Sequence, residues 1–314
     1  MQIHRSSPGL LVLIAASVLL TACASTTPQT EISIDSLVTT DRLGAHLDDP
    51  DLVVLDCTVS IVPAEGGGFQ IVNGRAAYDG GHIASAGFAD LMGDLADGDS
   101  SLHFAVPTPQ EFAAAMGRLG VGDDSRVVLY DRMGSGWAAR VWWMLRWIGF
   151  DRAAVLDGGW GAWTAEGRPQ SNEPAGRAPK RLTVSLRPEM IADRDEVLAA
   201  IDDDSVRLID AMPEAHFRGE MALYDRPGHI PGASNIPAMS LLDESGRYRP
   251  DDELAAMFEG DHDARTITYC GGGISASSAA FIMTRLGFDD VAVYTASLQE
   301  WAADPDKPLV AGTP

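Results

Sequence analysis

Lysine, cysteine and long hydrophobic runs are all scarce in this sequence of 314 residues. Lysine occurs only at Lys180 and Lys307, and 45 acidic residues against 23 Lys plus Arg give a formal net charge of −22. Nucleic-acid binding needs clustered Lys and Arg that face phosphates, so the composition argues against that class of partner. Such acidity ordinarily provides a solvated surface, and any anion site in this chain therefore needs local positive charge.

The three cysteines are Cys23, Cys57 and Cys270. Because the sequence has no Cys-x-x-Cys pair and no Cys/His cluster, we expect neither a zinc nor an iron–sulfur site. A disulfide between Cys57 and Cys270 is possible in an exported protein, but their sequence contexts indicate separate roles. For Cys57, which follows Asp56 at a predicted strand end, we expect a passive role, with a resolving thiol as the alternative.

The apolar run from Gly9 to Leu20 follows a basic start and is too short to span a bilayer with ordinary flanks. It ends in Leu20-Thr21-Ala22-Cys23, which resembles a bacterial lipobox. We therefore predict a lipoprotein signal peptide over 1–22, lipidation of Cys23 and a tether over 23–34. The alternative is an ordinary signal peptide cleaved nearby. The predicted location is the bacterial cell envelope, with a lipid anchor in the membrane, on the periplasmic side of a Gram-negative cell.

The rest of the chain is an internal duplication. The segment 127–163 matches the segment 266–301 and aligns Asp131 with Cys270. A stretch rich in Pro, Ala and Arg separates the two copies. The predicted organisation is a first domain over 35–169, a linker over 170–188 and a second domain over 189–314.

Strand-like and helix-like segments alternate in both copies. The pattern predicts strands over 126–130, 153–156, 265–269 and 291–294, and helices over 137–147 and 275–286, each helix ending before a glycine. Such alternation indicates an α/β fold of two tandem domains, each a mainly parallel sheet with helices on both faces. Folds of this class carry their sites at the carboxyl ends of the strands.

Cys270 is predicted to lie at such a strand end, before three glycines and a helix start. Glycines let the backbone curl around the thiol, and successive N–H groups and the helix N-terminus then favour an anion. This is how a nucleophilic thiolate is made. The predicted cradle comprises Gly271, Gly272, Gly273, Ile274, Ser275 and Ala276.

The run 269–276, YCGGGISA, resembles the active-site loop of rhodanese and mercaptopyruvate sulfurtransferases. The runs GHIPGA at 228–233 and NIP at 235–237 resemble a second signature of that family. The resemblance implies tandem rhodanese domains with an inactive first copy, where Asp131 cannot carry a persulfide. It also implies a Cys270 persulfide that moves sulfur from 3-mercaptopyruvate or thiosulfate, a small anion, to a thiol or cyanide, with no metal or organic cofactor.

The resemblance also suggests donor-binding residues. An Asp and a His of the first domain, thought to act in mercaptopyruvate enzymes, match Asp56 and His82. The arginines usual in the family are replaced, and Arg218 and Arg226 are near enough in sequence to supply the charge. Because the loop after Cys270 has no side-chain cation, the sequence favours 3-mercaptopyruvate as donor.

The sequence also bears on two other functions. A cysteine phosphatase needs an Arg six positions after the Cys, and Ala276 stands there. A sulfur-binding or scaffold lipoprotein with non-catalytic rhodanese domains remains the alternative, which the retained Cys270 disfavours and the replaced arginines favour.

Overall fold

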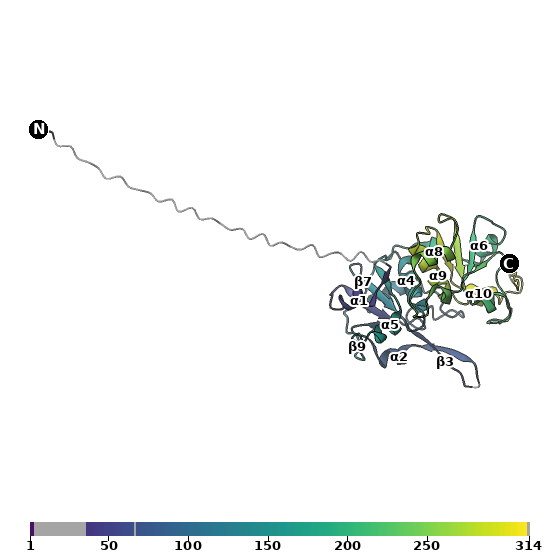
Figure 1. Ribbon diagram of the computed structural model, residues 1–314, viewed down its shortest axis with the longest axis horizontal. Coiled ribbons are helices and arrows are strands. Elements are labelled where there is room, and N and C mark those ends of the chain that lie inside the picture. The colour runs from purple at the N-terminus through teal and green to yellow at the C-terminus, as the bar shows by residue number, and fades with distance from the viewer. Residues whose placement is uncertain (3–35, 66, 313–314) are drawn as a thin grey trace. The chain divides into compact units, whose positions relative to one another are not determined.

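Two five-stranded parallel sheets, one in each half of the chain, form the framework of the molecule (Figure 1). The computed structural model describes residues 1–2, 36–65 and 67–312. The first sheet has the strand order β1-β8-β7-β2-β6, and the second has the order β10-β14-β13-β11-β12. The duplication in the sequence is thus the same topology built twice, which confirms the predicted α/β class with two tandem domains.

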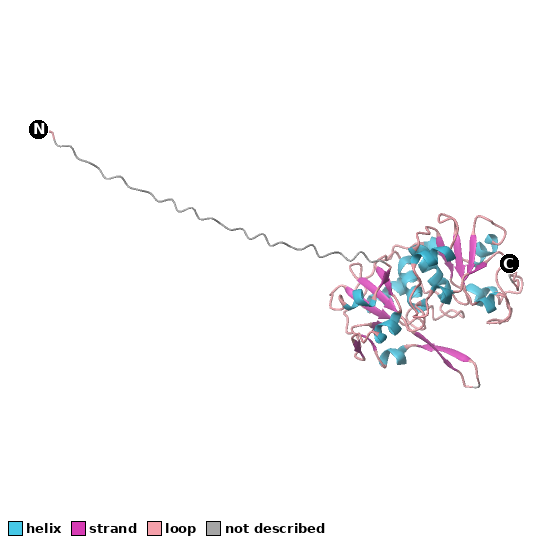
Figure 2. Ribbon diagram, in the orientation of Figure 1, coloured by secondary structure: helices cyan, strands magenta, loops and turns pink. Residues whose placement is uncertain are grey.

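The first half contains fourteen elements within the described residues, and Figure 2 distinguishes its strands from its helices. They are β1 (Leu37–Val38), α1 (Thr40–Gly44), β2 (Leu52–Asp56), β3 (Val59–Pro63), β4 (Phe69–Asn73), α2 (Arg75–Asp79), β5 (His82–Ile83), β6 (Gly87–Phe88), α3 (Pro109–Arg118), β7 (Arg126–Tyr130), α4 (Gly136–Trp147), β8 (Ala153–Leu156), α5 (Gly159–Ala165) and β9 (Gln170–Ser171).

The second half repeats the plan with fewer additions. Its elements are η1 (Pro188–Met190), β10 (Ile191–Ala192), α6 (Arg194–Ala200), β11 (Arg207–Asp210), α7 (Glu214–Phe217), β12 (Ser234–Asn235), η2 (Ala238–Leu241), α8 (Asp251–Met257), β13 (Thr266–Tyr269), α9 (Ile274–Arg285), β14 (Val291–Tyr294) and α10 (Ser297–Trp301). Both long helices begin one residue earlier than the sequence predicts. They end before Gly149 and Gly287, whose φ angles of 89° and 88° are left-handed.

Alternate residues of the central strands face two different cores, because successive side chains of a strand point to opposite faces of the sheet. Val53 and Leu55 of β2 pack in the cluster that includes α3 and α4. Leu52 and Val54 of the same strand pack in the cluster that includes Leu43 of α1 and Trp163 of α5. Helices therefore cover both faces of the first sheet.

The two domains meet through α4 and α9 (Figure 1), the long helices that follow the third strand of each sheet. Trp142 of α4 packs edge-on against Phe281 of α9, with ring centroids 4.8 Å apart, and both side chains are buried. Their core is continuous across this contact. Because each helix starts at the loop that ends its preceding strand, the packing gives each domain access to the loop of the other.

The predicted linker is more ordered than its composition suggests. Its first two residues form β9, which pairs antiparallel with β5, and Lys180 N–H donates to Gly117 O at 2.9 Å. The linker thus packs along the first domain. The predicted signal peptide beyond Met1 and Gln2, the lipidation site Cys23 and the tether lie outside the described residues. No helix among the described residues is long and apolar enough to cross a membrane.

Candidate active site

Cys270 lies in the turn between β13 and α9, and its side chain is buried, with 2% exposure. The turn is tight because Gly273, at the N-cap of α9, adopts a left-handed φ of 83° that side chains rarely tolerate. In this conformation the Gly273 N–H donates to the Sγ of Cys270 at 3.1 Å. One of the predicted cradle residues therefore contacts the sulfur directly.

The start of α10 and the Tyr224 side chain hold other polar groups of the turn. Leu298 N–H donates to Cys270 O, and Gln299 N–H donates to Gly271 O, both at 3.0 Å. The hydroxyl of Ser297 accepts from Cys270 N–H at 3.1 Å, and the hydroxyl of Tyr224 donates to Gly271 O at 2.8 Å. These bonds occupy the Cys270 N–H and the carbonyls of Cys270 and Gly271, while the Gly273 N–H donates to the sulfur.

The equivalent loop of the first domain carries the carboxyl group of Asp131 where the second domain has the cysteine. Asp131 Oδ1 accepts from Ser135 N–H at 3.0 Å, and its Oδ2 accepts from Ala138 N–H at 2.9 Å. Oδ1 also accepts from Met133 N–H at 2.7 Å. Burial raises the pKa of Asp131, while these three N–H groups act to lower it. The same kind of turn thus satisfies a buried carboxyl with main-chain donors.

The two loops can be matched through the left-handed residues that cap the helices after them. Ser135, with a φ of 61°, caps α4 as Gly273 caps α9. Counting from these caps, Ala138 corresponds to Ala276, the third residue of α9, and the first N–H groups of a helix have no partner within the helix. The Ala276 N–H is therefore the group suited to a second anionic atom attached to the Cys270 sulfur.

A residue that the sequence interpretation missed, Arg140 of α4, lies beside the turn. Its side chain is 1% exposed, and its Nη1 lies 3.1 Å from the point where a Cβ on Gly273 would be. The guanidinium comes from the first domain, and the only available signal was an arginine within the apolar run Ala138–Trp143 of a predicted helix. Ser297 and Tyr224 were also missed, because they come from segments far from Cys270 in sequence.

The two arginines predicted to bind the donor have other partners. Arg226 donates to four backbone carbonyls near the C-terminus, at 2.5 to 3.0 Å, which belong to Trp301, Ala302, Asp304 and Lys307. Arg218 forms an ion pair with Glu214 one helical turn earlier, on an exposed surface. Donor binding by either one stays a prediction.

Asp56 and His82 lie in the first domain, and in the part of the chain that the structure describes neither makes a hydrogen bond to Cys270. Asp56 Oδ1 accepts from Thr58 N–H at 2.9 Å, and Arg132 approaches Oδ2 at 3.6 Å. The His82 ring stacks on Tyr78 at 3.9 Å, and its Nδ1 and Nε2 lie 2.9 and 3.0 Å from the carbonyl oxygens of Tyr78 and Glu173. These contacts stabilise the first domain. Donor binding by Asp56 and His82 stays a prediction.

Cys57 is a free, fully buried thiol at the end of β2, as Cys270 is a free thiol at the end of β13. Burial, followed by the charges of Asp56 and Asp131, raises the pKa of Cys57 well above its usual range. A thiol held neutral in this way is a poor nucleophile, which agrees with the passive role predicted for it.

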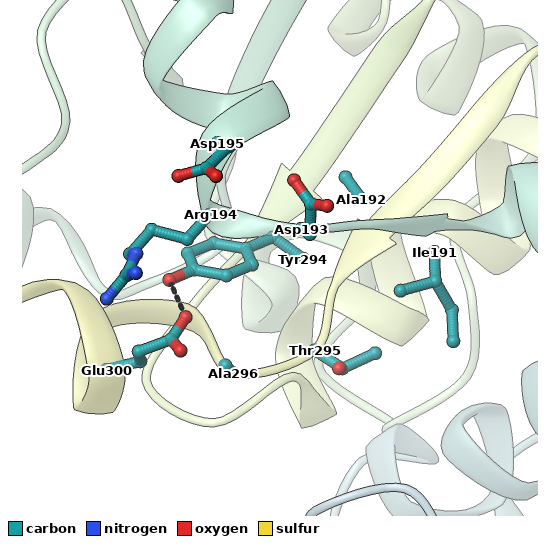
Figure 3. A pocket seen from close by; sticks show the side chains of 9 residues that line it. All are labelled: Ile191, Ala192, Asp193, Arg194, Asp195, Tyr294, Thr295, Ala296 and Glu300. Carbon is teal, nitrogen blue, oxygen red and sulfur yellow. Dashed lines mark hydrogen bonds between the residues drawn. The ribbon is translucent and has the colours of Figure 1, made fainter.

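A separate pocket of about 320 Å³ opens at the ends of β10 and β14 (Figure 3). Asp193, Asp195 and Glu300 line it, with Arg194 as the cation among them, and the Tyr294 hydroxyl donates to Glu300 at 2.5 Å. Cys270 is not among its lining residues. Its acidic walls disfavour a small anion. No group of three His, Cys, Asp or Glu residues among those described is placed to hold a metal ion.

The family model described as "Rhodanese-like domain" matches this chain twice, over residues 39–166 and 193–304. The chain belongs to the rhodanese family. The first match covers β2, β6, β7 and β8 of one sheet, and the second covers β11, β12, β13 and β14 of the other. The tandem arrangement inferred from the duplication is therefore that of two rhodanese domains, with Cys270 in the second and Asp131 at its equivalent in the first.

Relatives within this family are sulfurtransferases. The chain is 33% identical over 291 residues to a probable 3-mercaptopyruvate sulfurtransferase of Pseudomonas aeruginosa, covering 90% of this chain and 100% of the relative. It is 33% identical over 236 residues to the thiosulfate sulfurtransferase of Bos taurus, covering 72% and 79%. The crystal structure of the Escherichia coli 3-mercaptopyruvate sulfotransferase SseA matches with a TM-score of 0.74 and 31% identity, covering 83% of this chain and 98% of that one. By homology this rhodanese is a sulfurtransferase.

Proposed function

We propose that this rhodanese moves sulfane sulfur from 3-mercaptopyruvate to a thiol or cyanide acceptor through a persulfide on Cys270, with thiosulfate as a poorer donor. The observation that carries the proposal is the Gly273 N–H directed at the Cys270 Sγ over 3.1 Å. In the first domain, equivalent N–H groups donate to the carboxyl oxygens of Asp131, and these hydrogen bonds act to lower its pKa, which is the direction that favours an anion.

The chemistry has two balanced steps. In the first, the Cys270 thiolate attacks the donor sulfur, the carbon–sulfur bond of 3-mercaptopyruvate breaks, and the carbon takes the thiol proton to leave as pyruvate. The cysteine is left as a persulfide anion. In the second, cyanide attacks the terminal sulfur, thiocyanate leaves, and the electron pair of the sulfur–sulfur bond returns to Cys270 as thiolate. The N–H groups of Gly273 and Ala276 suit the anion in both states.

The donor preference rests on charge and shape near the turn. Beside Gly271, the points nearest to a virtual Cβ are Leu223 Cδ2 at 3.0 Å, the Tyr224 hydroxyl at 3.1 Å and Met212 Sδ at 3.6 Å. Burial, and next the Cys270 charge, raise the pKa of Tyr224 to about 12, so this hydroxyl stays a neutral donor. Such surroundings suit the single charge of 3-mercaptopyruvate better than the double charge of thiosulfate.

A steady-state comparison of the two donors, with cyanide as acceptor and thiocyanate as product, tests the proposal. We expect a higher kcat/KM with 3-mercaptopyruvate. A clear preference for thiosulfate contradicts the donor assignment. A protein that takes up sulfur but releases none to cyanide or to thiols is a sulfur-binding scaffold, and that result contradicts the catalytic function.

We also propose that the mature chain is exported and anchored by lipid at Cys23 to the bacterial cell envelope, on the periplasmic side in a Gram-negative cell. The support is the short apolar run followed by Leu20-Thr21-Ala22-Cys23. An exported location means that the acceptor thiol or cyanide is met outside the cytoplasm.

A further inference from the structure

Arg140 is a buried cation without a complete set of partners. One of its terminal nitrogens, Nη2, donates to Phe104 O at 3.0 Å, and its guanidinium lies 5.1 Å from the centre of the Trp143 ring. Its Nε and Nη1 have no hydrogen-bond partner in the part of the chain that the structure describes. An unpaired buried charge is costly, so a nearby negative charge must offset that cost at some stage of the protein's work.

The unpartnered Nη1 is the atom that faces the active-site turn. It lies 3.1 Å from the virtual Cβ of Gly273, the residue whose N–H donates to Cys270 Sγ. Burial lowers the pKa of Arg140 to about 10, and the negative charge of Cys270 acts in the opposite direction. Even at that pKa the guanidinium stays protonated at neutral pH, so it presents a full positive charge behind the turn.

The duplicated first domain offers a natural contrast. Counted from the left-handed caps, the residue of α9 that corresponds to Arg140 is Ser278, whose hydroxyl lies 3.2 Å from the Tyr248 hydroxyl. Both are neutral groups, and burial raises the pKa of Tyr248, with the charge of Asp131 acting in the same direction. The position of α4 beside the cysteine-bearing turn therefore carries a cation, whereas the corresponding position of α9 carries a neutral hydroxyl.

We propose that Arg140 is the buried counter-charge of the Cys270 sulfur, which it holds as thiolate before sulfur transfer and as persulfide anion afterwards. The inference rests on the proposed function, since it takes Cys270 to be the sulfur carrier. It gives the first domain, whose own loop carries Asp131 where the second has Cys270, a part in the reaction. Arg140 acts through the turn and through its field, as a positioning residue.

Other titratable groups also lie near the turn. Tyr224 is neutral over the working range, as described above. His103, in the loop before α3, contacts Gln299 of α10 through its backbone N–H and carbonyl, each at 3.0 Å. Glu300 of α10 is engaged with Tyr294. Within α9, the residues next to the cap are Ile274 and Ser275, which carry no charge.

The test measures the pH dependence of Cys270 alkylation by iodoacetamide in the full chain, with the Cys270→Ser variant as the background control. Arg140→Gln removes the charge and keeps a donor for Phe104 O. We expect its alkylation midpoint to rise by about one pH unit and its rate at pH 7 to fall about tenfold. Arg140→Lys, which keeps the charge, should recover most of the rate.

The matched control is Arg146→Gln. Arg146 lies on the same helix and pairs with Asp151 at 2.9 Å, so its loss should leave the alkylation midpoint unchanged. A folded Arg140→Gln protein with the wild-type midpoint overturns the proposal, since a merely structural residue changes stability without moving that midpoint.

A second measurement needs no variant of Arg140. The thiolate absorbance of the wild type, taken as the difference from Cys270→Ser, should titrate well below about pH 8.5, the value of a free thiol. A midpoint at or above that value overturns the proposal even if Arg140→Gln does not fold. Cyanide-labile sulfur on the wild type reports separately on the proposed function, so the failure of one is distinguishable from the failure of the other.

Discussion

The Gly273 N–H and the Cys270 Sγ, 3.1 Å apart, define the geometry of the active-site turn. The contact depends on a left-handed glycine at the cap of α9 and on a strand that ends one residue before the cysteine. The first domain repeats this contact between Ser135 N–H and Asp131 Oδ1 at 3.0 Å. Both copies thus share a turn with a main-chain donor aimed at the side chain after the strand, and the second copy carries the sulfur.

Gly273→Ala should disable the turn. Its added Cβ would lie 2.7 Å from Thr295 O, at a φ of 83° that costs L-residues about 1–2 kcal/mol. We expect a lower melting temperature and at least about a tenfold loss of thiocyanate formation, because the Gly273 N–H must move from the sulfur. Gly161→Ala in α5 is the control, because its added Cβ meets nothing within 4 Å. It should leave the melting temperature and thiocyanate formation almost unchanged. Full activity in Gly273→Ala contradicts the assigned role of its N–H.

Arg226→Ala should destabilise the second domain. The guanidinium ties the segment between α7 and β12 to carbonyls at and after α10, and hydrogen bonds from a charged donor contribute about 1.5–3 kcal/mol. Thermal unfolding measures the loss, and Arg226→Lys should rescue little because one ammonium cannot replace the planar fork. An unchanged melting temperature with a raised KM for 3-mercaptopyruvate would instead favour donor binding by this arginine.

Asp210, at the end of β11, makes stability depend on pH. Burial raises its pKa to about 7, and its Oδ2 has no partner among the described residues. The unfolded carboxyl titrates near pH 3.9, so the folded state binds more protons between these values. Stability should therefore fall as pH rises from about 4 to 7 and then level off. Melting temperatures over this window should show a flatter profile for Asp210→Asn, and identical profiles would show that Asp210 does not titrate there.

The tandem α/β fold could be predicted because hydrophobic patterning and internal repetition are both local properties of the sequence. The strand over 126–130 and the strand over 153–156 were predicted with the bounds that the structure has. The linker was harder, since its packing depends on Gly117 and on pairing between β9 and β5. Neither contact leaves a signal within the linker itself.

Cys270 and its glycines could be found from sequence because strand, thiol and helix start are adjacent. Arg140 could not, because its approach to the turn depends on how α4 packs against α9. Arg226 illustrates a second contact that the sequence could not reveal. Its hydrogen bonds to the carbonyls of Trp301 and Lys307 depend on how the chain folds back to it, and donor binding by this arginine stays a prediction.

Cys23→Ala should release the protein from membranes after signal cleavage. Lipid chains contribute roughly 0.8 kcal/mol per buried CH₂, so several chains give a stable anchor and their loss removes it. Fractionation of the cells, followed by detection of the mature chain, makes the measurement. Retention of the processed variant in the membrane fraction would refute lipidation of Cys23 as the anchor.

The most direct test of the account is the site of sulfur uptake. The protein is incubated with 3-mercaptopyruvate without acceptor and digested without reductant. The masses of its cysteine-containing peptides are then measured by mass spectrometry. The account predicts one added sulfur atom on the Cys270 peptide, removed by cyanide, in the wild type and in Cys57→Ser, and none in Cys270→Ser. Sulfur on Cys57, or uptake that survives in Cys270→Ser, would contradict the account.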